Sequence, residues 1–204
     1  MSAAGASCRE GHTGGTLAEG TGMHDELLGS THPILSISLE PGESVFGAAS
    51  QFAWMTDSIR MTSDDEDRKD ELELSVYTAT RTAGVVAFAA SRPGCVIGVE
   101  AADGYLISGS GFVAGGSGVR VRPARGQGLP LWQLTGSGRA WIGLGGDVVE
   151  RELTAGQSLR AQRDHVGMLV PTITSQVTEV QGICVLSGPG TVWLQSRSGN
   201  HEHR

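Results

Sequence analysis

The chain has 204 residues, of which 31 are glycine, and its formal charge is −7 from 22 acidic and 15 basic residues. A single all-β domain fits this length, whereas two full domains would be cramped. Lys69 is the only lysine and the arginines are dispersed, which disfavours nucleic-acid binding because a binding groove normally shows as a basic patch.

Residues 1–32 are rich in Gly, Ser, Thr and Ala, and we expect a flexible tail there because they bury too little apolar surface to offset the entropy of ordering. The segment lacks the pattern of a signal peptide, and no apolar run approaches the ~18 residues of a membrane span. Cys8, Cys95 and Cys184 share no CxxC or metal-binding spacing, so reduced thiols are expected. These features predict a cytoplasmic protein without membrane insertion.

From Pro33 onward, apolar and β-branched residues alternate with a period of two, which predicts strands and no long amphipathic helix. The predicted strands cover residues 34–39, 45–46, 72–77, 85–88, 95–99, 131–134, 140–144, 148–153 and 191–194. The acidic stretch 64–71 is expected to be a solvated loop, since it has no glycine for the turn of a calcium loop. We therefore predict one all-β domain over residues 33–198, followed by a flexible tail at 199–204.

The chain repeats itself internally. Residues 38–59 align without a gap on residues 152–173, so that Gly42 matches Gly156, and a weaker middle copy places Gly104 at the same point. A second element, G-x-G-x-x-W, recurs with its glycines at Gly136, Gly138, Gly188 and Gly190, and residues 82–88 are its poorer first copy. These matches predict about three related β-units with the seven glycines at structural turns.

The sequence pieces LEPGES at 39–44, RPG at 92–94, LTGSG at 134–138, LTAGQS at 153–158 and GPGTVWLQSRS at 188–198 follow one another along the chain. This succession resembles the altered-inheritance-of-mitochondria (mitochondrial biogenesis) family, including its bacterial members. The resemblance covers residues 33–198. It implies a double-stranded β-helix, a β-sandwich barrel of the TRAP-like type shared with the tryptophan RNA-binding attenuation protein. It also implies assembly through the sheets, with a trimer favoured, and scaffolding more than catalysis.

The enzyme class expected on such a fold is a metal-dependent cupin or oxygenase, which needs two or three histidines and a carboxylate converging on the metal. The predicted domain contains only His165, and its neighbour Asp164 would point to the opposite face of a strand. Cys95 and Cys184 lie in apolar runs, as small core residues do. We therefore expect no catalytic residues, no metal and no cofactor.

The tryptophans Trp54, Trp132, Trp141 and Trp193 are interpreted as packing or interface residues near corresponding ends of the repeats. A stacking platform for bases would combine aromatic with basic residues, and only Arg139 beside Trp141 fits that pattern. The sequence thus favours a non-enzymatic structural or interaction protein, a homo-oligomer with a further protein partner that the sequence does not identify. The alternative is a small-ligand or RNA-binding module of the attenuation-protein type.

Overall fold

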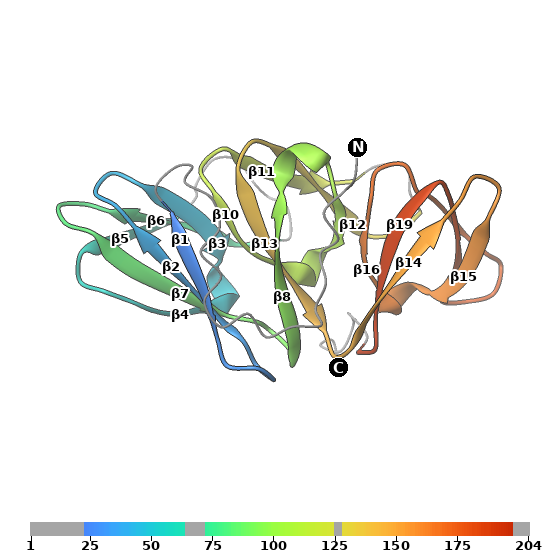
Figure 1. The fold of residues 1–204 in the computed structure, drawn as a ribbon, viewed down its shortest axis with the longest axis horizontal. Helices are drawn as coiled ribbons and strands as arrows, with labels where there is room; N and C mark the ends of the chain where they lie inside the picture. Colours follow the sequence, from blue (N-terminus) through green and yellow to red (C-terminus); the bar gives the residue numbers. More distant parts are fainter. Residues whose placement is uncertain (1–22, 64–71, 125–127, 198–204) are drawn as a thin grey trace.

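A computed structural model describes residues 23–63, 72–124 and 128–197 (Figure 1). The predicted loop at 64–71 and the predicted tails at 1–22 and 199–204 lie outside the described residues. The described chain is almost entirely antiparallel β-structure, so the all-β prediction is confirmed. Its helices are single 3-10 turns, and within the described ranges none is long and apolar enough to cross a membrane.

Eighteen of the strands form three successive six-stranded units. Unit 1 contains β2 (Ile34–Leu39), β3 (Ser44–Ala48), β4 (Phe52–Met55), β5 (Ile59–Ser63), β6 (Leu74–Ala79) and β7 (Gly84–Ala89). Unit 2 contains β8 (Gly94–Glu100), β9 (Leu106–Ser108), β10 (Phe112–Gly116), β11 (Val119–Pro123), β12 (Leu131–Gly136) and β13 (Arg139–Gly145). Unit 3 contains β14 (Val148–Leu153), β15 (Ser158–Gln162), β16 (Val166–Leu169), β17 (Thr174–Val177), β18 (Ile183–Ser187) and β19 (Gly190–Gln195). A 3-10 turn separates the second and third strand of every unit: η1 (Ala49–Gln51), η3 (Gly109–Gly111) and η4 (Arg163–His165).

Every unit has the same topology. Its first, sixth and third strands form one half-sheet, and its fourth, fifth and second strands form the other. The second strand of one unit pairs with the third strand of the next, which joins half-sheets of neighbouring units into continuous six-stranded sheets. Four sheets result: A (β1-β2-β7-β4), B (β5-β6-β3-β10-β13-β8), C (β11-β12-β9-β16-β19-β14) and D (β15-β18-β17).

The ladders place the repeated glycines at matching points. Leu39 lies opposite Gly84 in unit 1 and Leu153 lies opposite Gly190 in unit 3. Three residues after each leucine, Gly42 and Gly156 have φ of 89° and 84°, and Gly104 in unit 2 has φ of 71°. Of the other glycines that the sequence predicts at turns, Gly136, Gly138 and Gly190 also have positive φ, and Gly188 does not.

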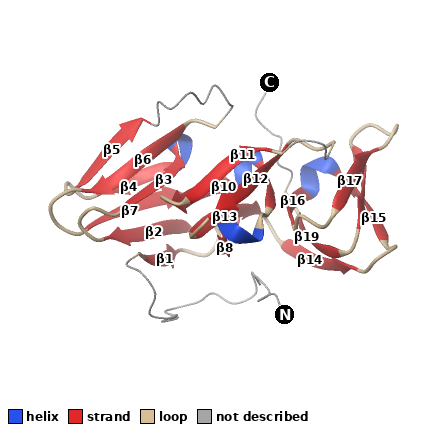
Figure 2. Ribbon diagram, turned by 90° about the horizontal axis from the view of Figure 1, so that it is seen from above, coloured by secondary structure: helices blue, strands red, loops and turns tan. Residues whose placement is uncertain are grey.

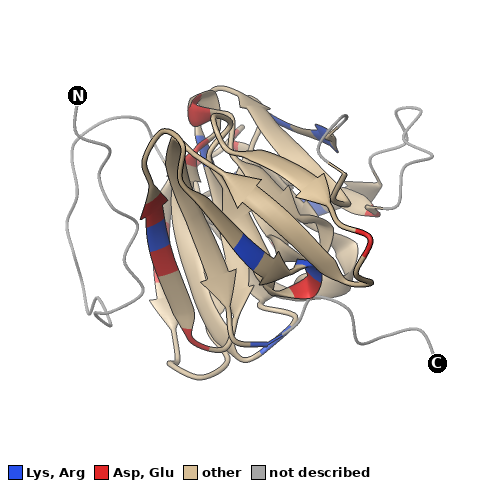
Figure 3. Cartoon of the chain, turned by 90° about the vertical axis from the view of Figure 1, so that its right-hand side faces the viewer, with Lys and Arg blue, Asp and Glu red and all other residues tan. Residues whose placement is uncertain are grey.

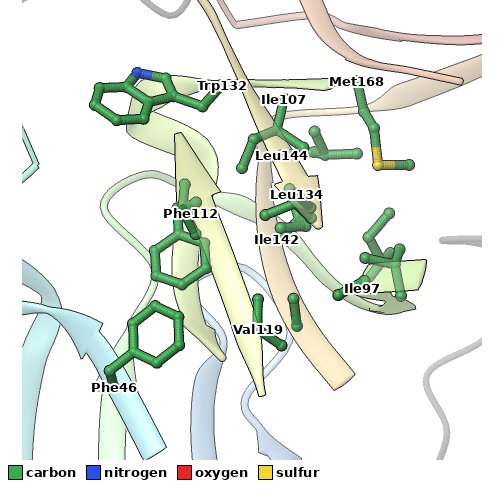
Figure 4. Close-up of a cluster of buried hydrophobic side chains, with 14 of the residues drawn as sticks. Phe46, Ile97, Ile107, Phe112, Val119, Trp132, Leu134, Ile142, Leu144 and Met168 are labelled. Carbon is green, nitrogen blue, oxygen red and sulfur yellow. The ribbon is translucent and has the colours of Figure 1, made fainter. Parts of the chain in front are cut away.

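The apolar side chains fill three layers between the stacked sheets. The layer between sheets A and B contains Leu35, Tyr77 and Phe88, and that between sheets C and D contains Leu131 and Leu186. The middle layer, between sheets B and C, is shown in Figure 4. Its labelled members are Phe46, Ile97, Ile107, Phe112, Val119, Trp132, Leu134, Ile142, Leu144 and Met168. Seen from above, the sheets form a row from β2 to β15 (Figure 2).

The ordered structure begins before the predicted boundary at Pro33. Strand β1 (His24–Leu28) pairs along its length with β2, with Asp25 opposite Ile37. Asp25 Oδ2 accepts a hydrogen bond from Trp141 Nε1 at 3.1 Å, and its Oδ1 lies 3.3 Å from the Arg139 guanidinium. A polar segment is ordered here because backbone pairing and a charge-assisted contact replace the missing apolar burial. Residues 24–28, which were predicted from the sequence to lie in a flexible tail over 1–32, therefore form a paired strand instead.

Replacing Gly136 by Ala should lower the free energy of unfolding more than replacing Gly156 by Ala. Both glycines have positive φ, which costs an L-residue roughly 1–2 kcal/mol. A Cβ at Gly156 would meet open space, whereas one at Gly136 would press on the Gly118 carbonyl oxygen. Urea denaturation of the two variants measures the difference, and equal losses would contradict the close packing at Gly136.

Candidate assembly interface: the open ends of the repeat

Two joints between units share one geometry. Between units 1 and 2, β10 pairs antiparallel with β3, and Ala114 lies opposite Gly47. Between units 2 and 3, β16 pairs antiparallel with β9, and Met168 lies opposite Ile107. Each joint supplies main-chain hydrogen bonds that neither unit makes alone.

The third strand has the same local form in every unit. Each has a register shift at its second residue, after which Trp54 lies opposite Ala87, Ala114 opposite Trp141, and Met168 opposite Trp193. Trp54, Ala114 and Met168 are therefore structural equivalents.

The second strands can be matched in the same way. A hydroxyl pair, Ser44 with Thr78 at 2.7 Å, joins β3 to β6, and the equivalent pair, Ser158 with Ser187 at 2.8 Å, joins β15 to β18. Three residues further along, Gly47 lies opposite Ser75, and Ala161 lies opposite Cys184. Ala161 is therefore the unit 3 equivalent of Gly47.

One second strand and one third strand have no partner from a neighbouring unit. They are β15, at the edge of sheet D, and β4, at the edge of sheet A. Figure 1 shows them at opposite ends of the molecule, so they do not meet within one chain. The described chain thus ends in the two complementary halves of a joint that it makes twice internally.

Exposure at these ends differs from exposure at the internal joints. The Trp54 side chain is 42% exposed, whereas its equivalents Ala114 and Met168 are fully buried. Alternate residues of β15 are exposed, while β3 is buried over four of its five residues. An unpaired strand edge is a template for pairing with another chain, and the exposed Trp54 lies on such an edge.

The four tryptophans occupy three kinds of position. Trp141 and Trp193 are equivalent, buried residues of the sixth strands, as the G-x-G-x-x-W match indicates. Trp132 is 8% exposed on the fifth strand of unit 2, and Trp54 lies on a third strand. The sequence singled out Trp54 among residues near repeat ends, but it missed Ala161 and Asp25, whose roles depend on pairings made far away in the chain.

The groups weighed for catalysis are dispersed. His165 lies in η4, half-buried, with Nδ1 2.7 Å from the carbonyl oxygen of Gln195. Cys184 is a buried free thiol. Cys95 is disulfide-bonded, so the expectation of a reduced thiol was wrong at that position. Over residues 23–63, 72–124 and 128–197, no three His, Cys, Asp or Glu side chains gather as metal ligands would.

Charge is spread thinly over the end of the molecule that carries sheet D. Figure 3 shows Lys, Arg, Asp and Glu scattered among uncharged residues there. The guanidinium of Arg139 is 5.9 Å from the Trp141 ring centroid, but the same guanidinium is paired with Asp25. In this basic-aromatic pair the Arg139 charge is therefore already neutralised by Asp25 and is not available to a phosphate.

The fold and its ends define a class of protein: an all-β chain of three repeated units whose terminal edges are unpaired. The family model described as mitochondrial biogenesis AIM24 matches residues 26–197, so the chain belongs to this family, as the sequence resemblance predicted. The crystal structure of protein SPYM3_0169 from Streptococcus pyogenes is similar, with a TM-score of 0.72 at 16% identity. That similarity covers 86% of this chain and 94% of the other, and at this identity it establishes the fold alone. No curated protein matches the chain.

Truncation of Trp141 to Ala should destabilise a single chain far more than truncation of Trp54 to Ala. Trp141 is 2% exposed, so Trp141→Ala should lower the free energy of unfolding by about 3–5 kcal/mol. Trp54→Ala should cost a single chain less than about 1 kcal/mol because the side chain is already partly in water. Denaturation at low protein concentration tests this pair, and a larger loss for Trp54→Ala would show that Trp54 belongs to the core.

Cys184 should react slowly with iodoacetamide in the folded chain. Burial raises the pKa of its thiol, outweighing the lowering by a backbone hydrogen bond at Ala161 and by the positive charge of Arg163. A raised pKa means less thiolate at pH 8, and the thiolate is the reacting form. Mass spectrometry of the alkylated peptide, with and without urea, measures the protection, and equal rates in the two conditions would refute it.

Proposed function

We propose that this protein is a non-enzymatic structural component that associates with copies of itself end to end. The observation that carries the proposal is the pair of internal joints with one shared register, together with the two unpaired halves of a third joint. Pairing β15 of one copy with β4 of the next would join the two chains by the same second-strand to third-strand contact that joins the units within one chain.

The internal joints specify the register of this contact. Gly47 and Ile107 are the equivalents of Ala161, and they lie opposite Ala114 and Met168. Ala161 of one copy therefore lies opposite Trp54 of the next, in an antiparallel pair. The indole then enters the space that the buried side chains of Ala114 and Met168 occupy at the internal joints.

The unpaired edges also supply a physical reason to associate. An exposed strand edge leaves main-chain donors and acceptors to water and is a template for uncontrolled pairing. Pairing between unlike ends of identical chains is heterologous, and it gives a closed ring when the rotation per copy closes. We favour a ring of three copies, in keeping with the family resemblance, and a scaffolding role in which this assembly presents its outer surfaces to a partner.

Light scattering on the purified full chain should give a mass near three times 21.2 kDa. Trp54→Lys should shift the mass toward that of one chain, because a charge would be buried at the joint. Leu27→Lys is the matched control: Leu27 is 41% exposed on β1, at the edge of sheet A opposite β4, and its replacement should leave the mass unchanged. A single-chain mass for the unaltered protein would overturn the proposal.

The register has its own test in a pair of cysteines. Directly opposite residues in an antiparallel pair have Cβ atoms about 4.5–5.5 Å apart, so Trp54→Cys and Ala161→Cys in one chain should form cross-links between copies on mild oxidation. Gel electrophoresis without reductant reads out the covalent oligomer. The pair Leu27→Cys with Ala161→Cys serves as control, since Leu27 lies on β1 at the edge of sheet A opposite β4, and equal cross-linking of both pairs would contradict the register.

A further inference from the structure

Strand β1 occupies a site that is built from two units. Its backbone pairs with the outer edge of β2, the first strand of unit 1. Its Asp25 side chain reaches across to unit 2, where Trp141 donates a hydrogen bond to it and Arg139 pairs with it. The site therefore has three components: the outer edge of a first strand, an indole N–H donor, and a charged side chain beside the indole, which here is Arg139.

The same arrangement recurs one unit later. Strand β8 is the first strand of unit 2, and in the described part of sheet B its outer edge carries no further strand. Val99 is the equivalent of Ile37, because each lies opposite the same position of a sixth strand: Ala140 for Val99 and Val86 for Ile37. Trp193, the equivalent of Trp141, is 4% exposed, and its Nε1 has no hydrogen-bond partner.

Within the described residues this buried N–H has no acceptor, which is unfavourable, so an acceptor placed on it is favoured. The residue that lies opposite the indole differs between the two sites. In unit 2 the Arg139 side chain covers Gly98, opposite Trp141. In unit 3 the position of Gly98 is taken by Glu150, opposite Trp193, and that side chain is exposed.

The charge of the second site is opposite to that of the first. Arg139 is replaced by Thr191, which lies opposite the exposed Glu152. Tyr105, whose ring lies 5.9 Å from that of Trp193, has its pKa raised by burial first and then by the carboxylates of Asp103 and Glu150. The first site accepts an acidic strand, whereas the second presents carboxylates to whatever lies on it.

We propose that the outer edge of β8 at Ile97–Glu100, with Trp193, Glu150 and Glu152, binds an extended, basic peptide segment of a partner protein. The segment adds to sheet B as β1 adds to sheet A, by main-chain pairing with a free edge. A neutral acceptor such as an Asn side chain opposite Val99 receives the Trp193 N–H. Lysines or arginines two residues to either side meet Glu150 and Glu152.

The probes for this site are two labelled ten-residue peptides with the sequence of residues 23–32. One is natural and acidic, and the other carries Met23→Lys, Asp25→Asn and Leu27→Lys. Fluorescence anisotropy with the full chain should show saturable binding of the basic peptide, about tenfold or more tighter than that of the natural one. N-methylation of alternate backbone nitrogens should abolish binding, because it removes the donors of the strand pairing.

The decisive variant is Glu150→Gly with Thr191→Arg, which recreates the Gly98 and Arg139 pattern around Trp193. This double variant should bind the natural acidic peptide more tightly than the basic one, the reverse of the unaltered chain. Arg151→Gln, on the opposite face of β14, is the matched control and should leave the preference of the unaltered chain in place. The proposal is overturned if neither peptide saturates, if both bind equally, or if the double variant keeps the original preference. None of these outcomes depends on whether copies of the chain associate.

Discussion

The organisation of this protein depends on one constraint: a single unit cannot satisfy the main chain of its own second and third strands. Those two strands lie at the edges of their half-sheets, and their outward N–H and C=O groups find partners only on a neighbouring unit. Unit 2 has a neighbour on both sides, whereas units 1 and 3 have one each. The shared register of the two joints follows from this incomplete hydrogen bonding, and the exposed Trp54 lies on one of the two edges that it leaves unpaired within the described residues.

Some glycines lie within strands and not in turns, and the close approach of the packed sheets explains their presence there. At Gly115 a Cβ would lie 3.1 Å from the Phe46 ring and 3.2 Å from Val119, so the strand admits no larger residue without displacement. Gly47, across the same joint, faces the ring of Phe88 in a similar way. The excess of glycine thus serves two purposes, positive φ in the turns and thin backbone where two sheets meet.

Repetition made much of this architecture predictable. The match of residues 38–59 with 152–173 correctly paired Leu39 with Leu153 and Trp54 with Met168, because local turn chemistry and apolar periodicity recur in each unit. Strand β10 was not predicted, since Ala114-Gly115-Gly116 has little β-propensity and is held by β3 and β13 on either side. Strand β1 was missed for the same reason: its partners, β2 and Trp141, lie outside its own sequence window. Likewise, the unpaired edges of β4 and β15 are visible only once strand order is known.

The equal register of the two internal joints has an evolutionary consequence. Because every joint is the same, duplication or loss of one unit in the gene would leave both ends of the chain unaltered and still matched to each other. Length in this architecture is therefore modular, and in the proposed end-to-end array a chain of two or four units would pair by the same edges as a chain of three. Under that proposal, selection on the number of units would act through the curvature at which the array closes, not through the stability of any one joint.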